Sequence, residues 1–286
     1  MNIFWTILIG SLIGINCSIV GCYLVLRKMS MMSDAISHSI LPGIVISFII
    51  TKSKSTISML IGAIIMGITA TFLIEFLKKK IKIKTDASIG IVFTFLFSIG
   101  IILVSYFTNQ IDLDQDCVLY GEISYVALDL WITESGINLG PKSIYLLTFI
   151  LLFNLMFIKL SYKELFITTF DPEFSESIGI KTKNWHYILM IIVSITIVSS
   201  FESVGTILVI SFIVIPAATS YIIVNKLEKM LIMSSIFSIS SSILGYYFAV
   251  LINGSISGSI STISGIIFFI FFFMKTRKNK IKHKIN

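Results

Sequence analysis

The chain has 286 residues, of which 56% are hydrophobic and only 13% are charged. A soluble domain carries about 25% charged residues, so this composition excludes a water-soluble globular protein and indicates an integral membrane protein. The net charge of +7 comes from short basic clusters at the ends of apolar segments. That placement is typical of the cytoplasmic ends of membrane spans, and it argues against nucleic-acid binding.

Apolar segments long enough to approach a membrane span, about 20 residues, follow one another along the chain. They cover residues 3–26, 34–50, 57–77, 86–107, 143–161, 187–201, 204–224, 230–251 and 259–274. We therefore predict an all-α polytopic membrane protein with about eight or nine transmembrane helices. Two of the segments are divided only at the sequence FES, where we expect either a tight hairpin or a discontinuous span.

Asp34 and His38 lie four residues apart within the apolar second segment, in the sequence MSDAISHSILPG. Helical spacing places them on one face, and an ionised carboxylate inside a bilayer costs at least about 2.5–3.5 kcal/mol, so it normally faces a partner or a water-filled path. Carboxylate and imidazole suit a first-row divalent cation, and a two-fold dimer would supply two such pairs. The residues alone equally allow an Asp–His hydrogen bond that joins helices, or a carboxylate that caps its helix.

Two positions in the chain combine proline and glycine with apolar sequence. Pro42 and Gly43 predict a helix break just after the Asp–His pair, which fits a permeation path but also fits an ordinary proline kink. Gly205 and Pro216 lie in the 204–224 segment, where small residues favour close helix packing. Glu202 precedes that segment and is either a solvated helix end or a weak contact for a passing cation.

The distribution of lysine and arginine predicts the sidedness of the loops. We expect a transmembrane domain over residues 1–274, with the acid-rich loop 108–142 external and the loop 162–186 cytoplasmic. Residues 275–286 form a basic tail that we place in the cytoplasm, so the N-terminus is expected outside. The lysines at 52 and 54 are exceptions to this pattern.

The loop 162–186 contains the sequence FDPEFSESIGI, which predicts a short helix of its own. Asp171 is a residue type that caps helix N-termini, Pro172 suits the first helical position, and Gly179 can end the helix. Phe174 and Ile178 share one face of this helix. It is either a docking element for a cytoplasmic partner or a helix that lies on the membrane surface.

The remaining reactive residues do not form a recognisable site in the sequence. Cys17, Cys22 and Cys117 have no spacing typical of a disulfide framework or a zinc finger. His186, at a span boundary, is expected to be interfacial or solvated. The chain contains no G-x-x-x-x-G-K-[ST] phosphate-binding loop and no H-E-x-x-H motif. If the protein pumps a solute, the energy therefore comes from another subunit or from an ion gradient.

The segment GCYLVLRKMSMMSDAISHSILPGIVISFI, residues 21–49, resembles the signature of the zinc/manganese/iron permease family of ABC importers. Further segments resemble landmarks of that family in the same order: TDASIGIVF, YGEI, TTFDPEFSESIGI and SVGTILVISFIVIPAATSY. The resemblance extends over essentially the whole chain. Two positions depart from the family pattern, because Ser33 stands where a glycine is usual and Glu202 stands where a neutral residue is usual.

The resemblance implies a multi-pass permease of the bacterial cytoplasmic membrane that has no ATPase site of its own. Its partners would be a second copy of itself, two cytoplasmic ATPase subunits and an extracytoplasmic metal-binding protein. It would import Mn²⁺ as first choice, then Zn²⁺ or Fe²⁺, with ATP bound by the partner and no permanently bound cofactor. Asp34 and His38 would contact the metal, with a weaker role for Glu202. The residues expected to couple the chain to the ATPase are Phe170, Asp171, Pro172, Glu173, Phe174 and Gly179.

Two other functions use the same pair of residues. A proton-coupled secondary metal-ion transporter would employ Asp34 and His38 as a proton relay and would need no ATPase. An intramembrane metalloenzyme would employ them as metal ligands, but it also needs a third ligand and a general base. For that base the membrane segments offer only Glu75 and Glu202, which both lie at span ends.

Overall fold

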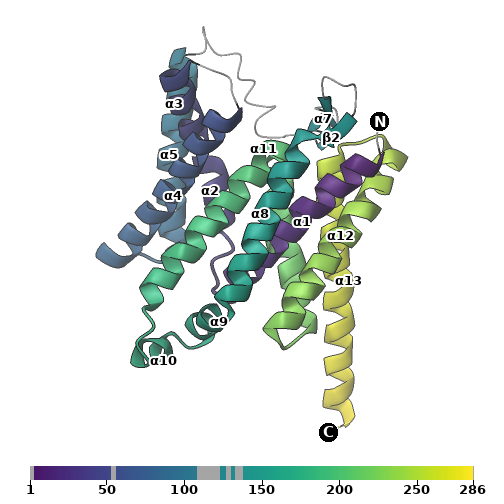
Figure 1. Cartoon of the computed structure of the whole chain (residues 1–286). Helices are drawn as coiled ribbons and strands as arrows, with labels where there is room; N and C mark the ends of the chain where they lie inside the picture. The colour runs from purple at the N-terminus through teal and green to yellow at the C-terminus, as the bar shows by residue number, and fades with distance from the viewer. Residues whose placement is uncertain (1–2, 53–55, 108–122, 127–129, 133–137, 286) are drawn as a thin grey trace. The chain divides into compact units, whose positions relative to one another are not determined.

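The computed structural model describes residues 3–52, 56–107, 123–126, 130–132 and 138–285, and helices dominate it (Figure 1). Within these residues nine helical segments are long and apolar enough to cross a membrane. This count confirms the predicted all-α polytopic fold. Residues 108–122, which carry most of the acids of the predicted external loop together with Cys117, lie outside the described residues.

The chain divides into two compact units, and each unit combines segments that are distant in the sequence. One unit comprises Met1–Leu26, Glu122–Phe157 and Ile207–Asn286. The other comprises Arg27–Gly121 and Ile158–Thr206. The Asp–His pair and the 162–186 loop therefore belong to the same unit.

The first unit is built on three helices, α1 (Ile3–Leu26), α12 (Leu227–Ile252) and α13 (Ile256–Ile285). Helix α12 packs against both α1 and α13, and Figure 1 shows α12 and α13 side by side. A left-handed residue, Asn253, ends α12 and permits the short connection to α13. The unit also contains α7 (Ile123–Val126), β1 (Leu130–Ile132), β2 (Asn138–Pro141) and most of α8 (Lys142–Leu160).

The strands β1 and β2 pair antiparallel, with Leu130 opposite Pro141 and Ile132 opposite Asn138. This small hairpin was not predicted, since the sequence between residues 108 and 142 indicates only an acid-rich loop. Strands of three and four residues are too short to produce a clear alternation of apolar and polar side chains.

Glycines bring the helices of the first unit into backbone contact. A methyl group placed on Gly21 of α1 would lie 2.8 Å from the carbonyl carbon of Ile213, so the two backbones already touch. Gly245 of α12 approaches the backbone of Ile260 in α13 in the same way. In a bilayer the association of helices depends on such close packing, because lipid is as apolar as the side chains.

The second unit contains α2 (Met32–Ser39), α3 (Leu41–Thr51), α4 (Thr56–Lys80) and α5 (Thr85–Phe107). Helix α3 packs against α4 and α5, and α2 also contacts both of them. Helix α2 ends just before Pro42, which confirms the predicted break. Gly43 and Gly62 face each other at the contact of α3 with α4, where neither position has room for a methyl group.

Helix α11 (Thr182–Ile223) has 42 residues, about twice the length that a bilayer requires. Its backbone leaves the helical conformation at Gly205, with φ +77° and ψ 174°, a combination that is essentially restricted to glycine. Two candidate spans, Thr182–Phe201 and Ser203–Ile223, meet near this residue, so the predicted division at FES is confirmed. Pro216 lies within the second span and does not interrupt it.

Replacement of Gly21 by alanine is expected to lower the stability of the protein. The added methyl group has to push α1 away from the backbone at Ile213, and such overpacking costs about 1–3 kcal/mol. Thermal unfolding in detergent measures the effect. Gly90→Ala is the matched control, because a methyl group at Gly90 meets no atom within 4 Å. Equal melting temperatures for the two variants would contradict the close contact.

Candidate functional site

Helix α2 carries more polar residues than is usual for a segment of a membrane span. Its serine hydroxyls donate hydrogen bonds to backbone carbonyls three or four residues earlier. The Ser33 hydroxyl donates to the Ser30 carbonyl at 2.7 Å, and the Ser37 hydroxyl donates to the Ser33 carbonyl at 2.9 Å. The Ser39 hydroxyl donates to the Ala35 carbonyl at 2.6 Å. Local bonds of this kind satisfy buried hydroxyls without a partner helix. They also explain how a serine fits at position 33.

Asp34 and His38 share one face of α2, as their spacing predicted. Asp34 Oδ1 lies 3.4 Å from His38 Nε2, and their side chains are 46% and 25% exposed. This distance is longer than the 2.7–3.2 Å of a good N–H···O hydrogen bond. The pair lies within one helix and therefore does not join two helices, and α2 has no side-chain bond at its N-cap. The role of the pair as a metal contact stays a prediction.

The imidazole of His38 is held by two aromatic rings of α5. Its centroid lies 5.2 Å from that of Phe93 and 5.7 Å from that of Phe97. The two phenylalanines stack on each other with centroids 5.9 Å apart. Their packing limits the rotation of the imidazole, so that its Nε2 edge is turned toward Asp34. Sequence reasoning missed both phenylalanines, although their i, i+4 spacing on an apolar span was a signal for a shared face.

The second ring nitrogen of His38, Nδ1, is buried and has no hydrogen-bond partner among the described residues. A buried polar atom without a partner is costly. The His38 side chain, next to the loosely held carboxylate of Asp34, is therefore suited to bind a proton, a water molecule or a cation. A neutral imidazole offers one nitrogen lone pair, so the pair provides one ring nitrogen and the carboxylate as donors.

One copy of the chain does not complete a metal site within its described residues. No group of three or more histidine, cysteine, aspartate or glutamate side chains occurs there. Asp34 and His38 supply two donors, whereas stable metal sites in proteins use four or more. The side chain of Glu202 lies outside the described residues, so its predicted weak role stays a prediction.

The predicted short helix in the 162–186 loop is present as α10 (Pro172–Ser177), which follows α9 (Tyr162–Phe170). Asp171 caps α10, because its Oδ1 accepts a hydrogen bond of 3.0 Å from the Phe174 backbone N–H, and Pro172 occupies the first turn. Gly179 adopts a left-handed conformation with φ +86° just beyond the helix. The start and end signals in this sequence were therefore interpreted correctly.

Helices α9 and α10 present a row of exposed apolar side chains. The rings of Phe166 and Phe170 are tilted against each other with centroids 4.8 Å apart, and the side chains are 41% and 53% exposed. Phe174 and Ile178 are 54% and 49% exposed. Apolar side chains gathered on one surface mark a contact with a partner protein or with a membrane. The capped turn at Asp171 fixes how α10 presents its part of this row.

His186 does not occupy the solvated position that was expected for it. Its side chain is only 17% exposed, and its Nε2 lies 3.0 Å from Oε1 of Glu75. Of the two expected positions, interfacial or solvated, the solvated one is wrong, and the pairing was missed because Glu75 lies 111 positions away in the chain.

Comparison with known proteins identifies the family. The model of the ABC 3 transport family matches residues 1–275. The chain is 40% identical over 262 residues to the manganese transport system membrane protein MntD of Bacillus subtilis, covering 92% of this chain and 88% of the relative. It is 37% identical over 262 residues to the zinc transport system membrane protein TroD of Treponema pallidum, covering 92% and 71%.

A solved structure supports the same assignment. The structure of PsaBC from Streptococcus pneumoniae in complex with Fab matches with a TM-score of 0.80 and 31% sequence identity, covering 99% of this chain and 96% of that chain. The fold, the nine candidate spans and the matched relatives agree with one another. The chain therefore belongs to the ABC 3 transport family, as a multi-pass permease of the bacterial cytoplasmic membrane.

Proposed function

We propose that this chain is the permease subunit of an ATP-driven importer of divalent transition-metal ions, with Mn²⁺ as first choice and Zn²⁺ or Fe²⁺ next. The observation that carries the proposal is the loosely held Asp34–His38 pair on a helix turn within a membrane span. Relatives named as manganese or zinc transport proteins support the class of cargo.

The pair offers one hard oxygen donor and one borderline nitrogen donor, a combination suited to Mn²⁺, Fe²⁺ and Zn²⁺. Two donors bind weakly, and weak binding is what transport requires, since an ion held tightly would not leave. Two copies of the chain related by a two-fold axis would bring two carboxylates and two imidazoles to one ion.

The energy for import would come from two cytoplasmic ATPase subunits, because the sequence contains no phosphate-binding loop. The exposed apolar row of α9 and α10 supports docking of such a partner, with Phe170, Phe174 and the Asp171 cap at the contact. An extracytoplasmic metal-binding protein would deliver the ion to the opposite side, where the 108–142 loop is expected. The basic tail 275–286 is placed on the ATPase side by the positive-inside rule.

Replacement of Asp34 by asparagine, or of His38 by alanine, is expected to reduce metal uptake to background. Each change removes one of the two donors that the chain supplies to the ion. Uptake of radioactive manganese by proteoliposomes that contain the permease, the ATPase and the binding protein measures the effect. Co-purification of the ATPase is expected to be unchanged in both variants.

Asp86→Asn is the matched control for this experiment. Asp86 is also a carboxylate in the first turn of a membrane-spanning helix, but it is exposed and belongs to α5. Uptake by this variant should equal that of the unaltered protein. Normal uptake by either the Asp34 or the His38 variant would refute a role for the pair in the ion path.

Replacement of Asp171 by alanine is expected to weaken the complex with the ATPase. The change removes the cap of α10, which is worth about 1 kcal/mol, so the helix presents Phe174 less rigidly. Asp171→Asn keeps a capping oxygen and serves as the matched comparison. Quantitative co-purification of the ATPase tests this expectation, and equal recovery with both variants would show that the cap does not contribute to docking.

A further inference from the structure

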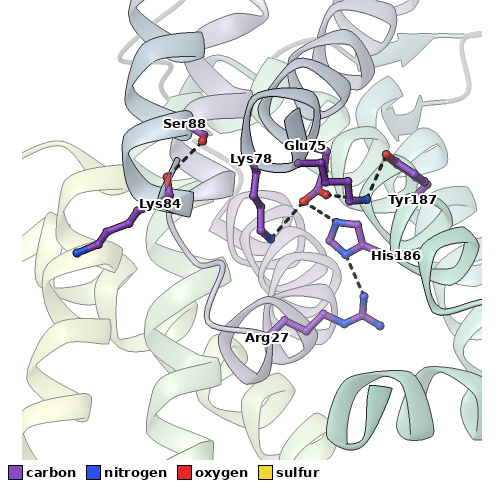
Figure 2. A network of polar contacts seen from close by, with 8 residues as sticks. Arg27, Glu75, Lys78, Lys84, Ser88, His186 and Tyr187 are labelled. Carbon is purple, nitrogen blue, oxygen red and sulfur yellow. Dashed lines mark hydrogen bonds and ion pairs between the residues drawn. The ribbon is translucent and has the colours of Figure 1, made fainter. Parts of the chain in front are cut away.

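A second cluster of charged side chains lies within the unit that contains α9 and α10, at the junction of four segments (Figure 2). Its centre is Glu75 of α4, whose side chain is only 2% exposed. Glu75 Oε1 lies 3.5 Å from Lys78 Nζ and 3.0 Å from His186 Nε2, while Oε2 lies 3.2 Å from Lys79 Nζ. A carboxylate surrounded in this way is held in place by its partners.

The neighbours of His186 determine the role of each of its ring nitrogens. Arg27 lies 3.3 Å from His186 Nδ1, and a guanidinium group can only donate hydrogen bonds. Nδ1 is therefore the acceptor of this contact, and the other ring nitrogen, Nε2, faces Glu75. Figure 2 shows the imidazole between the guanidinium and the carboxylate. Arg27 thus donates to one ring nitrogen of His186, while the other ring nitrogen lies 3.0 Å from Glu75 Oε1.

The same arginine reaches α9. Arg27 Nε donates to the Thr169 hydroxyl at 3.1 Å, and a terminal nitrogen of Arg27 donates to the Thr168 hydroxyl at 3.1 Å. Two side chains, those of Arg27 and His186, thus connect α9 with the end of α4. The fork geometry of a guanidinium allows these donations at the same time.

The cluster is not suited to hold a second metal ion. Glu75 and His186 are ligand types, but Arg27, Lys78 and Lys79 place three positive charges around them. Lys79 also lies over the ring of Tyr187 with its nitrogen 5.0 Å from the centroid. A divalent cation would meet repulsion from every side, so the cluster is a mechanical connection and not a coordination site.

We propose that Arg27, His186 and Glu75 form a positioning relay that fixes α9 to the ends of α4 and α11 and so transmits displacement of the α9–α10 segment to those helices. The inference rests on the proposed function, in which the ATPase docks on α9 and α10. Helix α10 packs against α9, so a push on α10 reaches the threonines that Arg27 binds. From there it passes through His186 to α4 and α11.

The test replaces His186 by leucine and by glutamine in the complete complex in lipid. Glutamine can accept from Arg27 through its carbonyl oxygen and donate to Glu75 through its amide, whereas leucine can do neither. With leucine the amount of metal imported per ATP hydrolysed is expected to fall by about fivefold or more, while ATP hydrolysis and assembly persist. Glutamine is expected to restore most of this ratio. Lys80→Ala, which removes a neighbouring exposed charge on α4, should leave the ratio unchanged.

A second readout follows the position of α9 directly and needs no transport. Backbone hydrogen exchange of α9, measured by mass spectrometry on the full chain in nanodiscs, should accelerate with leucine at position 186 and return toward normal with glutamine. Thr169→Val, which removes one acceptor at constant volume, should accelerate it as well and is used if the leucine variant does not assemble. Unchanged exchange in both variants overturns the relay, whether or not the complex imports metal.

The two readouts separate the relay from the proposed function. Absence of ATP-dependent metal uptake by the unaltered complex would count against the proposed function. The hydrogen exchange of α9 would still support or overturn the relay, because it does not depend on transport. A parallel loss of ATP hydrolysis and uptake with leucine, equal to that with glutamine, would show that His186 serves folding only and would overturn the relay.

Discussion

The cost of an uncompensated charge in or near the bilayer is the constraint on which this structure depends. Glu75 meets it with close ionic contacts, since three neighbouring side chains lie within 3.5 Å of its two carboxylate oxygens. Asp34 does not, because its partner His38 lies at 3.4 Å and keeps a buried ring nitrogen without a partner among the described residues. The two acid–histidine pairs therefore differ in how closely their charged groups are contacted. We propose that the Glu75–His186 pair holds helices together and that the Asp34–His38 pair receives the ion.

The arrangement of the helices follows from a related constraint. Lipid provides no hydrophobic force between helices, so contact depends on how closely two backbones approach. Glycines at positions 21, 43, 62 and 245 provide that approach within each unit. The serine hydroxyls of α2 and α12 bond back to their own helices, so these polar residues fit between helices without unsatisfied groups. Rigid packing of this kind is what allows the few remaining polar residues to hold defined positions.

Much of the fold could be predicted from the sequence because its signals are local. Apolar segments of about 20 residues gave the spans, and Asp171, Pro172 and Gly179 marked the ends of α10. The i, i+4 spacing placed Asp34 and His38 on one face.

The contacts that define each site were harder to predict, because they join distant parts of the chain. Phe93 and Phe97 lie in α5, whereas His38 lies in α2. Likewise, the sequence spacing of Arg27, Glu75 and His186 does not indicate that their side chains meet. The short hairpin of β1 and β2 was missed because its strands are too brief.

We propose that ATP hydrolysis by partner subunits drives a metal ion past the Asp34–His38 pair. Manganese uptake into proteoliposomes under two alternative energy sources distinguishes this mechanism from a proton-coupled one. With the ATPase and the binding protein present, ATP alone is expected to drive uptake, and a protonophore should not diminish it. Uptake driven by an imposed proton gradient in vesicles that contain this chain without the ATPase would contradict the claim and favour a proton-coupled carrier.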